Sequence, residues 1–129
     1  MDVTVGWALD TFGHNAQMPQ LLKLAGYKSY WFQRGVPNLE VPSDWLWEGI
    51  DGTRIPAFYH AYGLLGYTPD NIDDFNSFIK KQFDSLAPSS PGTNRVGLAG
   101  GDVMPPRESL PAMVKEFENQ ADKPFDLRF

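Results

Sequence analysis

Polar side chains follow several predicted strands of this 129-residue chain, each at the point where an apolar run stops. The carboxyl ends of parallel strands lie on one edge of a sheet, so residues far apart in sequence can meet in one pocket there. The positions that share this property are Asp10, Arg34, His60, Tyr62 and Asp102. Two of them, Asp10 and Asp102, are carboxylic acids, a residue type that can act as a nucleophile or as a proton donor.

The elements that precede the first two positions are a strand, a helix and a second strand. Residues 3–9 predict a buried strand, because a short apolar run ends there in an acidic residue and a turn. Apolar residues at helical spacing over 15–25 predict a helix, with Asn15 as its N-cap and Gly26 as its stop. Residues 27–33 predict the next strand.

The following segment predicts a hairpin-like excursion before or around the third strand. Residues 45–47 and 55–59 are rich in aromatic and aliphatic side chains and flank the turn signal Asp51-Gly52. Pro56 weakens the beginning of the second of these strands, because proline has no N–H to donate to a ladder.

The second half predicts two helices and two further strands. An apolar stripe over 71–86, with two acidic residues in its first turn, predicts the longer helix. Residues 95–99 predict a strand, a helix follows with Ser109 as its cap, and 125–129 predict the last strand. The alternation of strand and helix favours one α/β unit over residues 1–129, with a mainly parallel sheet.

The stretch around Asp10 resembles a known family. The residues that carry the resemblance are Gly6-Trp-Ala-Leu-Asp-Thr-Phe-Gly-His-Asn-Ala-Gln-Met-Pro-Gln-Leu-Leu22, Ala25-Gly-Tyr27 and Phe32-Gln-Arg34. They are similar to the nucleophile segment of the retaining α-mannosidases of glycoside hydrolase family 38, where a strand ends in Trp-x-x-Asp-x-Phe-Gly-His. That family's catalytic barrel is much longer than this chain, so the resemblance implies that residues 1–129 are an incomplete piece of a (β/α) barrel-like catalytic domain.

The resemblance implies roles for Asp10, Arg34 and Asp102 and an α-mannoside as substrate. Asp10 would be the nucleophile and a metal ligand, and Arg34 would orient it. Asp102, in a segment similar to the family's Gly-x-Asp-(His or Gln)-x-Pro, would be the acid/base, although Val103 departs from that pattern. A retaining glycosidase needs these two carboxyl groups about 5–5.5 Å apart. Phe12, His60 and Tyr62 are expected to bind substrate because of their positions past strand ends, and Arg34 is expected to bind it as well.

One zinc ion is the cofactor that the resemblance implies. A catalytic zinc keeps about three or four protein ligands and an open position, whereas this chain has 2 histidines and neither lies in a His-x-Asp arrangement. The family's other ligands would fall outside residues 1–129. We therefore expect His14 to orient its loop rather than bind metal, and the isolated chain to be inactive and to bind zinc weakly or not at all.

Composition limits the classes of binding partner and the cellular location that we expect for this chain. The formal net charge is -5 and the 11 Lys and Arg residues are scattered, so no basic stripe exists to hold nucleic acid. No apolar run approaches the ~20 residues that span a membrane, and no signal-peptide pattern is present. The absence of cysteine excludes disulfides and fits a cytoplasmic protein. The expected protein partner is the rest of the catalytic domain, and an oligomer stays open.

Two other functions stay open on the sequence. A metal-dependent polysaccharide deacetylase on a related barrel would need an Asp/His metal set and would form no covalent intermediate. A non-enzymatic, carbohydrate-binding or degenerate domain would keep the pocket without the metal. Because an Asp at a strand end is often a turn or cap residue, Asp10 alone does not distinguish these functions.

Overall fold

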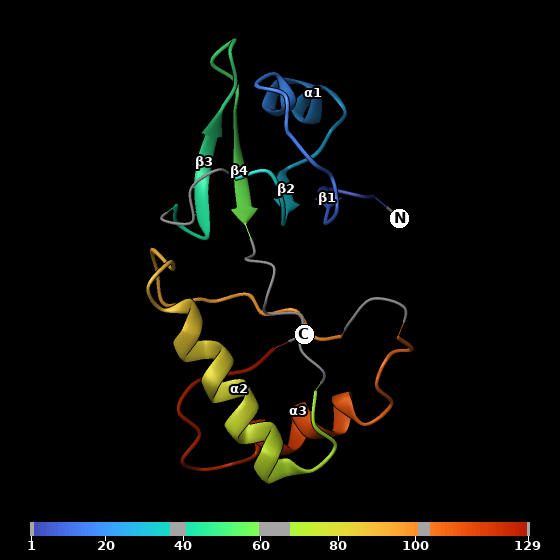
Figure 1. The fold of residues 1–129 in the computed structure, drawn as a ribbon, viewed down its shortest axis with the longest axis vertical. Coiled ribbons are helices and arrows are strands. Elements are labelled where there is room, and N and C mark those ends of the chain that lie inside the picture. Colours follow the sequence, from blue (N-terminus) through green and yellow to red (C-terminus); the bar gives the residue numbers. More distant parts are fainter. Residues whose placement is uncertain (1, 37–40, 60–67, 101–103, 129) are drawn as a thin grey trace. The chain divides into compact units, whose positions relative to one another are not determined.

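The described residues form two compact units. The first unit contains residues 1–62 and 88–94, and the second contains 63–87 and 95–129. The structure, a computed structural model, describes residues 2–36, 41–59, 68–100 and 104–128. Each unit is an arrangement of its own, with a sheet in the first and paired helices in the second (Figure 1).

A four-stranded sheet in the order β1-β2-β4-β3 forms the first unit. Its strands are β1 (Val5–Ala8), β2 (Ser29–Phe32), β3 (Asp44–Glu48) and β4 (Arg54–Tyr59). β2 pairs in parallel with both β1 and β4, whereas β3 runs antiparallel to β4. The mixed α/β class and the mainly parallel sheet are confirmed, while closure into a barrel stays a prediction.

The predicted hairpin is confirmed in β3 and β4, which flank the turn containing Gly52. This glycine has a φ of 82°, a conformation that turns favour and other residues rarely adopt. Pro56 lies inside β4, opposite Leu46 of β3, but the ladder from β4 to β2 begins one residue later, at Ala57. Pro56 therefore interrupts neither of the two parallel pairings.

Helix α1 (Met18–Leu24) connects β1 to β2 and begins later than predicted. Gln17, not Asn15, is its N-cap and makes no side-chain cap hydrogen bond. Asn15 instead accepts a hydrogen bond from the Gln17 N–H at 2.8 Å, which forms a turn that leads into the helix. Gly26, with a φ of 87°, ends the helix as predicted, because it and the next residue donate backbone hydrogen bonds to the last turn.

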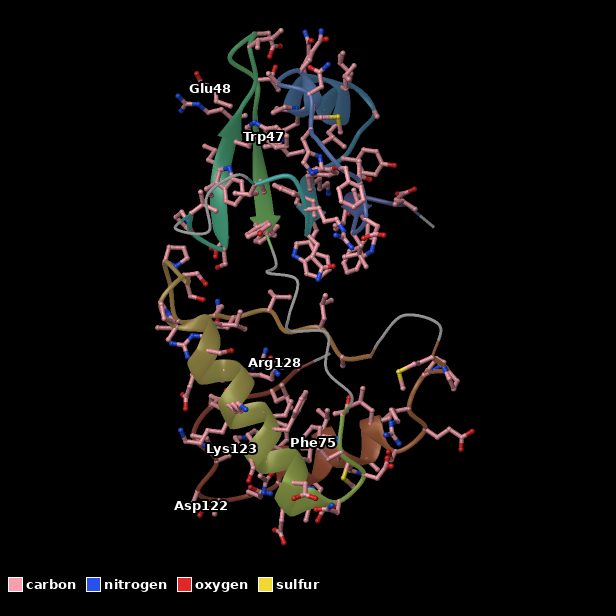
Figure 2. All side chains as sticks on the ribbon, viewed as in Figure 1. Trp47, Glu48, Phe75, Asp122, Lys123 and Arg128 are labelled. Atoms are coloured by element: carbon pink, nitrogen blue, oxygen red, sulfur yellow. The ribbon has the colours of Figure 1, made fainter. Side chains whose placement is uncertain are left out.

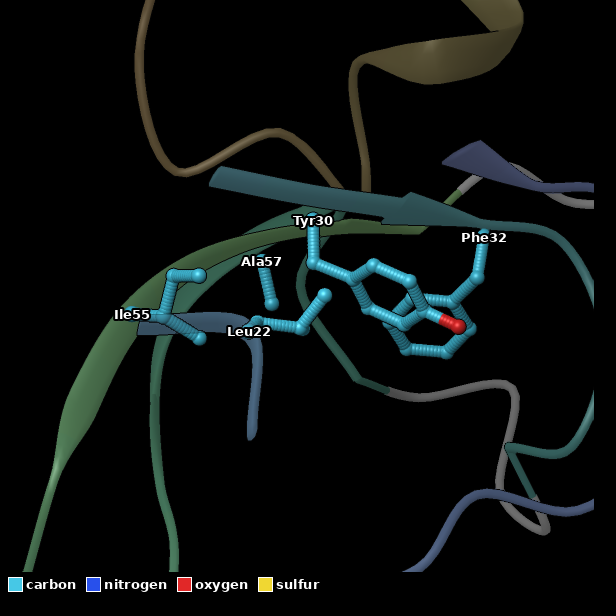
Figure 3. Close-up of a cluster of buried hydrophobic side chains, with 5 residues drawn as sticks. All are labelled: Leu22, Tyr30, Phe32, Ile55 and Ala57. Atoms are coloured by element: carbon cyan, nitrogen blue, oxygen red, sulfur yellow. The ribbon is translucent and has the colours of Figure 1, made fainter. Parts of the chain in front are cut away.

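The core of the first unit lies on one face of the sheet. Alternate residues of β2 and β4 point to the same side and pack against α1, each contributing about 1.5–3 kcal/mol when a large side chain is fully buried. Trp47 on β3 extends this core, and its neighbour Glu48 points away (Figure 2). The buried members of the cluster are Leu22, Tyr30, Phe32, Ile55 and Ala57 (Figure 3).

Trp7 belongs to the opposite face of the sheet from this core. The register pairs Trp7 with Trp31, and their ring centroids lie 3.9 Å apart. Trp7 is nevertheless 58% exposed. The reason is its position in β1: the strand's alternation turns Gly6 and Ala8, but not Trp7, to the side that α1 covers.

The second unit packs α2 (Ile72–Leu86) against α3 (Leu110–Glu118). Phe75 of α2 and Phe117 of α3 are buried and meet edge to face, with ring centroids 6.4 Å apart. Asn71 caps α2, because its Oδ1 accepts the Asp74 N–H at 2.9 Å. Both helices were predicted, and among the described residues neither they nor α1 could cross a membrane.

The two strands predicted in the second unit are wrong for the described residues. Residues 95–99 contain an isolated bridge but no strand, because Arg95 donates to the Phe83 carbonyl at 2.8 Å and lies 3.7 Å over its ring. Residues 125–128 form no strand either, since Phe125 stacks on Phe83 with ring centroids 4.0 Å apart. Phe125 packs against α2 and α3 through Phe83 and Phe117, whereas Val96 in the other segment is 59% exposed.

Candidate active site

Asp10 and Arg34 meet at the carboxyl ends of β1 and β2. The parallel register pairs Ala8 with Phe32, and its continuation by two residues aligns Asp10 with Arg34. Arg34 Nε donates a hydrogen bond to Oδ1 of Asp10, which makes the two an ion pair. The Asp10 side chain is 70% exposed and that of Arg34 only 25%. The carboxylate is therefore accessible, while the cation that holds it is largely covered.

Phe12 joins this pair from the loop that follows Asp10. The Arg34 guanidinium carbon lies 4.6 Å from the centroid of its ring, which is a cation–π contact. The Phe12 side chain is 74% exposed. Three of the predicted site residues thus lie together, with an acid and an aromatic side chain both open to solvent.

His14 binds the same two segments through its imidazole. Its Nε2 lies 2.8 Å from the Arg34 carbonyl oxygen, and its Nδ1 lies 3.3 Å from the Tyr30 hydroxyl. A carbonyl only accepts, so Nε2 carries the proton and Nδ1 accepts from Tyr30. Burial raises the pKa of Tyr30, which keeps the proton on that hydroxyl. Both nitrogens are used, and this supports the orienting role rather than metal binding.

Sequence reasoning missed Tyr30 and Gly35 as parts of this site. Tyr30 was predicted only as a strand residue, although it supplies the second partner of His14. Gly35 has a φ of 88°, and a Cβ at this position would lie 2.9 Å from Cδ2 of His14. A glycine directly after a strand end was the available signal for such a turn.

Three predicted site residues lie outside the described part of the chain: His60, Tyr62 and Asp102. Their roles, and the separation of Asp10 from Asp102, stay predictions. β4 ends at Tyr59, directly before His60, as expected. Asp102 differs, because residues 95–99 form no strand that could place it at a sheet edge. Its assignment now depends on its glycine-containing motif alone.

The described residues do not by themselves fit a zinc ion. Within them no group of three or more His, Asp or Glu side chains gathers. Asp10 offers a carboxylate at the sheet edge, and both nitrogens of His14 are engaged. A catalytic zinc site takes about three protein ligands, so the donors described here are too few.

Comparison with known proteins decides the family. The model of the glycosyl hydrolases family 38 N-terminal domain matches residues 1–126. The chain belongs to glycoside hydrolase family 38. Its motif around Asp10 is therefore a family 38 motif, and the resemblance drawn from the sequence is confirmed.

Individual relatives of this family 38 chain are similar over shorter stretches. Alpha-mannosidase 2C1 of Mus musculus is 33% identical over 66 residues, and that of Homo sapiens is 32% identical over 66 residues. Each match covers 46% of this chain and 6% of the relative. The crystal structure of an alpha-mannosidase from Enterococcus faecalis V583 is similar over 90% of this chain and 14% of its own, with a TM-score of 0.79 and 24% identity. This last likeness shows a shared fold.

Proposed function

We propose that this chain supplies part of the active site of a retaining α-mannosidase. The observation that carries the proposal is the ion pair of Asp10 and Arg34, at the edge of a parallel sheet and within the family 38 motif. The matched curated relatives are alpha-mannosidases by name, but the chain spans only 6% of their length. The activity is accordingly assigned to the complete protein and not to these residues alone.

Asp10 is proposed as the nucleophile. Its carboxylate attacks C1 of the mannosyl residue while the bond from C1 to the leaving oxygen breaks, through a transition state with oxocarbenium character. The product of this step is a covalent glycosyl-enzyme. Arg34 supports the step because its guanidinium holds the Asp10 carboxylate by a hydrogen bond and limits its rotation. The exposure of Asp10 supports access of a sugar to it.

Asp102 is proposed as the acid/base. It protonates the departing oxygen in the first step and removes a proton from the attacking water in the second, so the free enzyme is regenerated. Its support is the segment Gly100-Gly-Asp-Val-Met-Pro-Pro106, with Val103 as a departure from the family pattern. The exposed ring of Phe12 is suited to stack on the apolar face of the sugar. The remaining proposed sugar contacts are His60 and Tyr62.

Zinc stays a proposed cofactor, with Asp10 as one ligand and the others from outside residues 1–129. When bound, such an ion supplies electrostatic stabilisation of the sugar's oxygens. The steps assigned to Asp10 and Asp102 are derived without it. A cytoplasmic location is likewise proposed, on the absence of cysteine.

The stereochemistry of the product tests this function in the complete protein. Proton NMR during hydrolysis of an aryl α-mannoside should show α-mannose first, with the β anomer growing in only by mutarotation. A polysaccharide deacetylase would leave this glycoside intact and would release acetate only from an acetylated sugar offered in a parallel assay. A carbohydrate-binding domain would bind mannose without turnover. β-Mannose as the first product would reject the retaining mechanism.

A further inference from the structure

We propose that His14 is a positioning residue that locks the loop carrying Asp10 onto the end of β2. The inference rests on the proposed function for its catalytic consequence, but its structural part stands on contacts within the first unit. His14 does not touch the carboxylate of Asp10 in these contacts. It acts on the backbone of the residue that does, Arg34.

Two of the contacts that Arg34 makes link the loop after β1 to the end of β2. Its side chain holds Asp10, and its carbonyl oxygen accepts from His14, four residues further along the same loop. The β1–β2 ladder ends at Ala8 and Phe32, so it does not reach these residues. Two separate links beyond the ladder hold the loop at Asp10 and at His14, which limits where the Asp10 carboxylate can lie.

Packing holds the imidazole in the orientation that these hydrogen bonds need. The His14 ring centroid lies 4.5 Å from that of Phe32 and 6.2 Å from that of Trp47. Both partners belong to the core on the α1 side of the sheet. The imidazole thus packs against the aromatic side chains of this face. A rotation of the ring would lose these contacts as well as the hydrogen bonds.

Gly35 is the structural requirement for this arrangement. A Cβ there would lie 2.9 Å from Cδ2 of His14 and 3.2 Å from the backbone nitrogen of Gly13. Its φ of 88° also disfavours any other residue. A side chain at this position would therefore push the imidazole away from the Arg34 carbonyl.

A pair of variants in the complete protein separates the hydrogen bond from simple ring packing. His14→Phe keeps a ring but has no nitrogen, so the rate of glycosylation of Asp10 by an activated aryl mannoside should fall by about 10- to 100-fold. The loss should appear in kcat more than in KM, because the misplaced group is the attacking one. His14→Gln, whose amide can still donate to the Arg34 carbonyl, should lose about threefold or less, clearly less than His14→Phe.

A matched control uses the hairpin. Glu48→Gln breaks the exposed ion pair with Arg54, 2.5 Å long, without touching the loop of Asp10. This variant should leave glycosylation unchanged. Equal losses in His14→Phe and His14→Gln would overturn the proposal, since the hydrogen bond would then not be the feature that matters. An unchanged rate in His14→Phe would overturn it as well.

Amide hydrogen exchange gives a readout that does not depend on activity. In His14→Phe, peptides covering residues 10–17 should exchange faster, while those covering α3 should not change. If His14→Phe does not fold, Gly35→Ala takes its place, with the same faster exchange expected. Unchanged exchange over 10–17 would overturn the lock. If the natural protein hydrolyses no mannoside, the proposed function fails, and exchange still decides the lock by itself.

Discussion

Arg34 Nε donates to Oδ1 of Asp10 across the carboxyl ends of two parallel strands, at positions that the strand register aligns. The same guanidinium lies over the ring of Phe12. One cation therefore fixes an acid and an aromatic side chain of a single loop. This arrangement makes the consequences of changing each residue separable.

Arg34→Gln should lower kcat for an aryl α-mannoside by about 10²-fold in the complete protein, because a preorganised charge beside the attacking carboxylate is lost. Arg34→Lys should lie between this variant and the natural enzyme, since it keeps the charge but not the planar group that contacts both Asp10 and Phe12. Steady-state kinetics measures both. Natural kcat in Arg34→Gln would contradict the orienting role.

Phe12→Ala should affect substrate binding without affecting stability. The side chain is exposed, so the free energy of unfolding should change by about 0.5 kcal/mol or less. KM should rise by about tenfold if the ring stacks on sugar. Phe12→Tyr is the control that keeps the ring. Phe75→Ala is the contrasting variant for stability, because truncating this buried ring should lower the free energy of unfolding by about 3–5 kcal/mol. An unchanged KM in Phe12→Ala would show that the Phe12 ring does not contact the substrate.

The two helices of the second unit should respond differently to loss of their cap residues. Asn71→Ala removes a capping hydrogen bond of 2.9 Å and should cost about 1 kcal/mol in a urea titration of the chain. Ser109 makes no cap bond to α3, and its hydroxyl donates to the exposed Asp70 at 2.7 Å instead. Ser109→Ala should therefore cost about 0.5 kcal/mol or less. A larger loss for Ser109 than for Asn71 would show that these caps are misassigned.

The segment after α3 is anchored to the Glu118 carboxylate, and this anchoring should stabilise the fold only over a limited range of pH. The Leu127 N–H and then Lys123 Nζ, at 2.9 Å, bind the Glu118 carboxylate and hold its pKa below the ordinary 4.5. A depressed folded pKa means that this stabilisation is present above pH 4.5 and is lost as pH falls through the folded value. Glu118 and then Asp126 raise the pKa of Lys123 above 10.5, so its contribution is present below that pH and is lost as pH rises through the folded value.

Exchange of the Leu127 amide measures this window. Protection should be greatest between about pH 5 and pH 10 and should fall on both sides. Glu118→Gln should remove the decrease on the acid side, because the titrating group is gone. Glu116→Gln, on the same helix, is the matched control and should behave as the natural chain. Identical profiles for Glu118→Gln and the natural chain would contradict the assignment.

Local sequence patterns predicted most of the helices and strands. They failed where contacts between residues far apart in the sequence determine the structure. α2 and its cap involve residues within four positions of each other, so the sequence contains the whole signal. Residues 95–99 and 125–128 have the aliphatic and aromatic composition of strands, yet Arg95 and Phe125 pack on Phe83 instead. Composition alone therefore does not distinguish a strand from an irregular segment, because the contacts that decide between them lie far away in the sequence.

In the candidate site, too, some contacts could be predicted from the sequence and others could not. The pairing of Asp10 with Arg34 was predictable, because strand ends of a parallel sheet share an edge. The contacts of His14 with Tyr30 and the Arg34 carbonyl were not, since they depend on the path of two loops. The orienting role of His14 could be expected from the sequence, but its partners could not.

The most direct measurement of the central claim is covalent trapping of the complete protein with a mechanism-based fluorinated mannosyl donor, followed by mass mapping of the peptides. We expect a fluoromannosyl label on the peptide that contains Asp10, and no label in Asp10→Asn. A label on a different carboxylate, or turnover of the donor with no covalent adduct, would contradict Asp10 as the nucleophile.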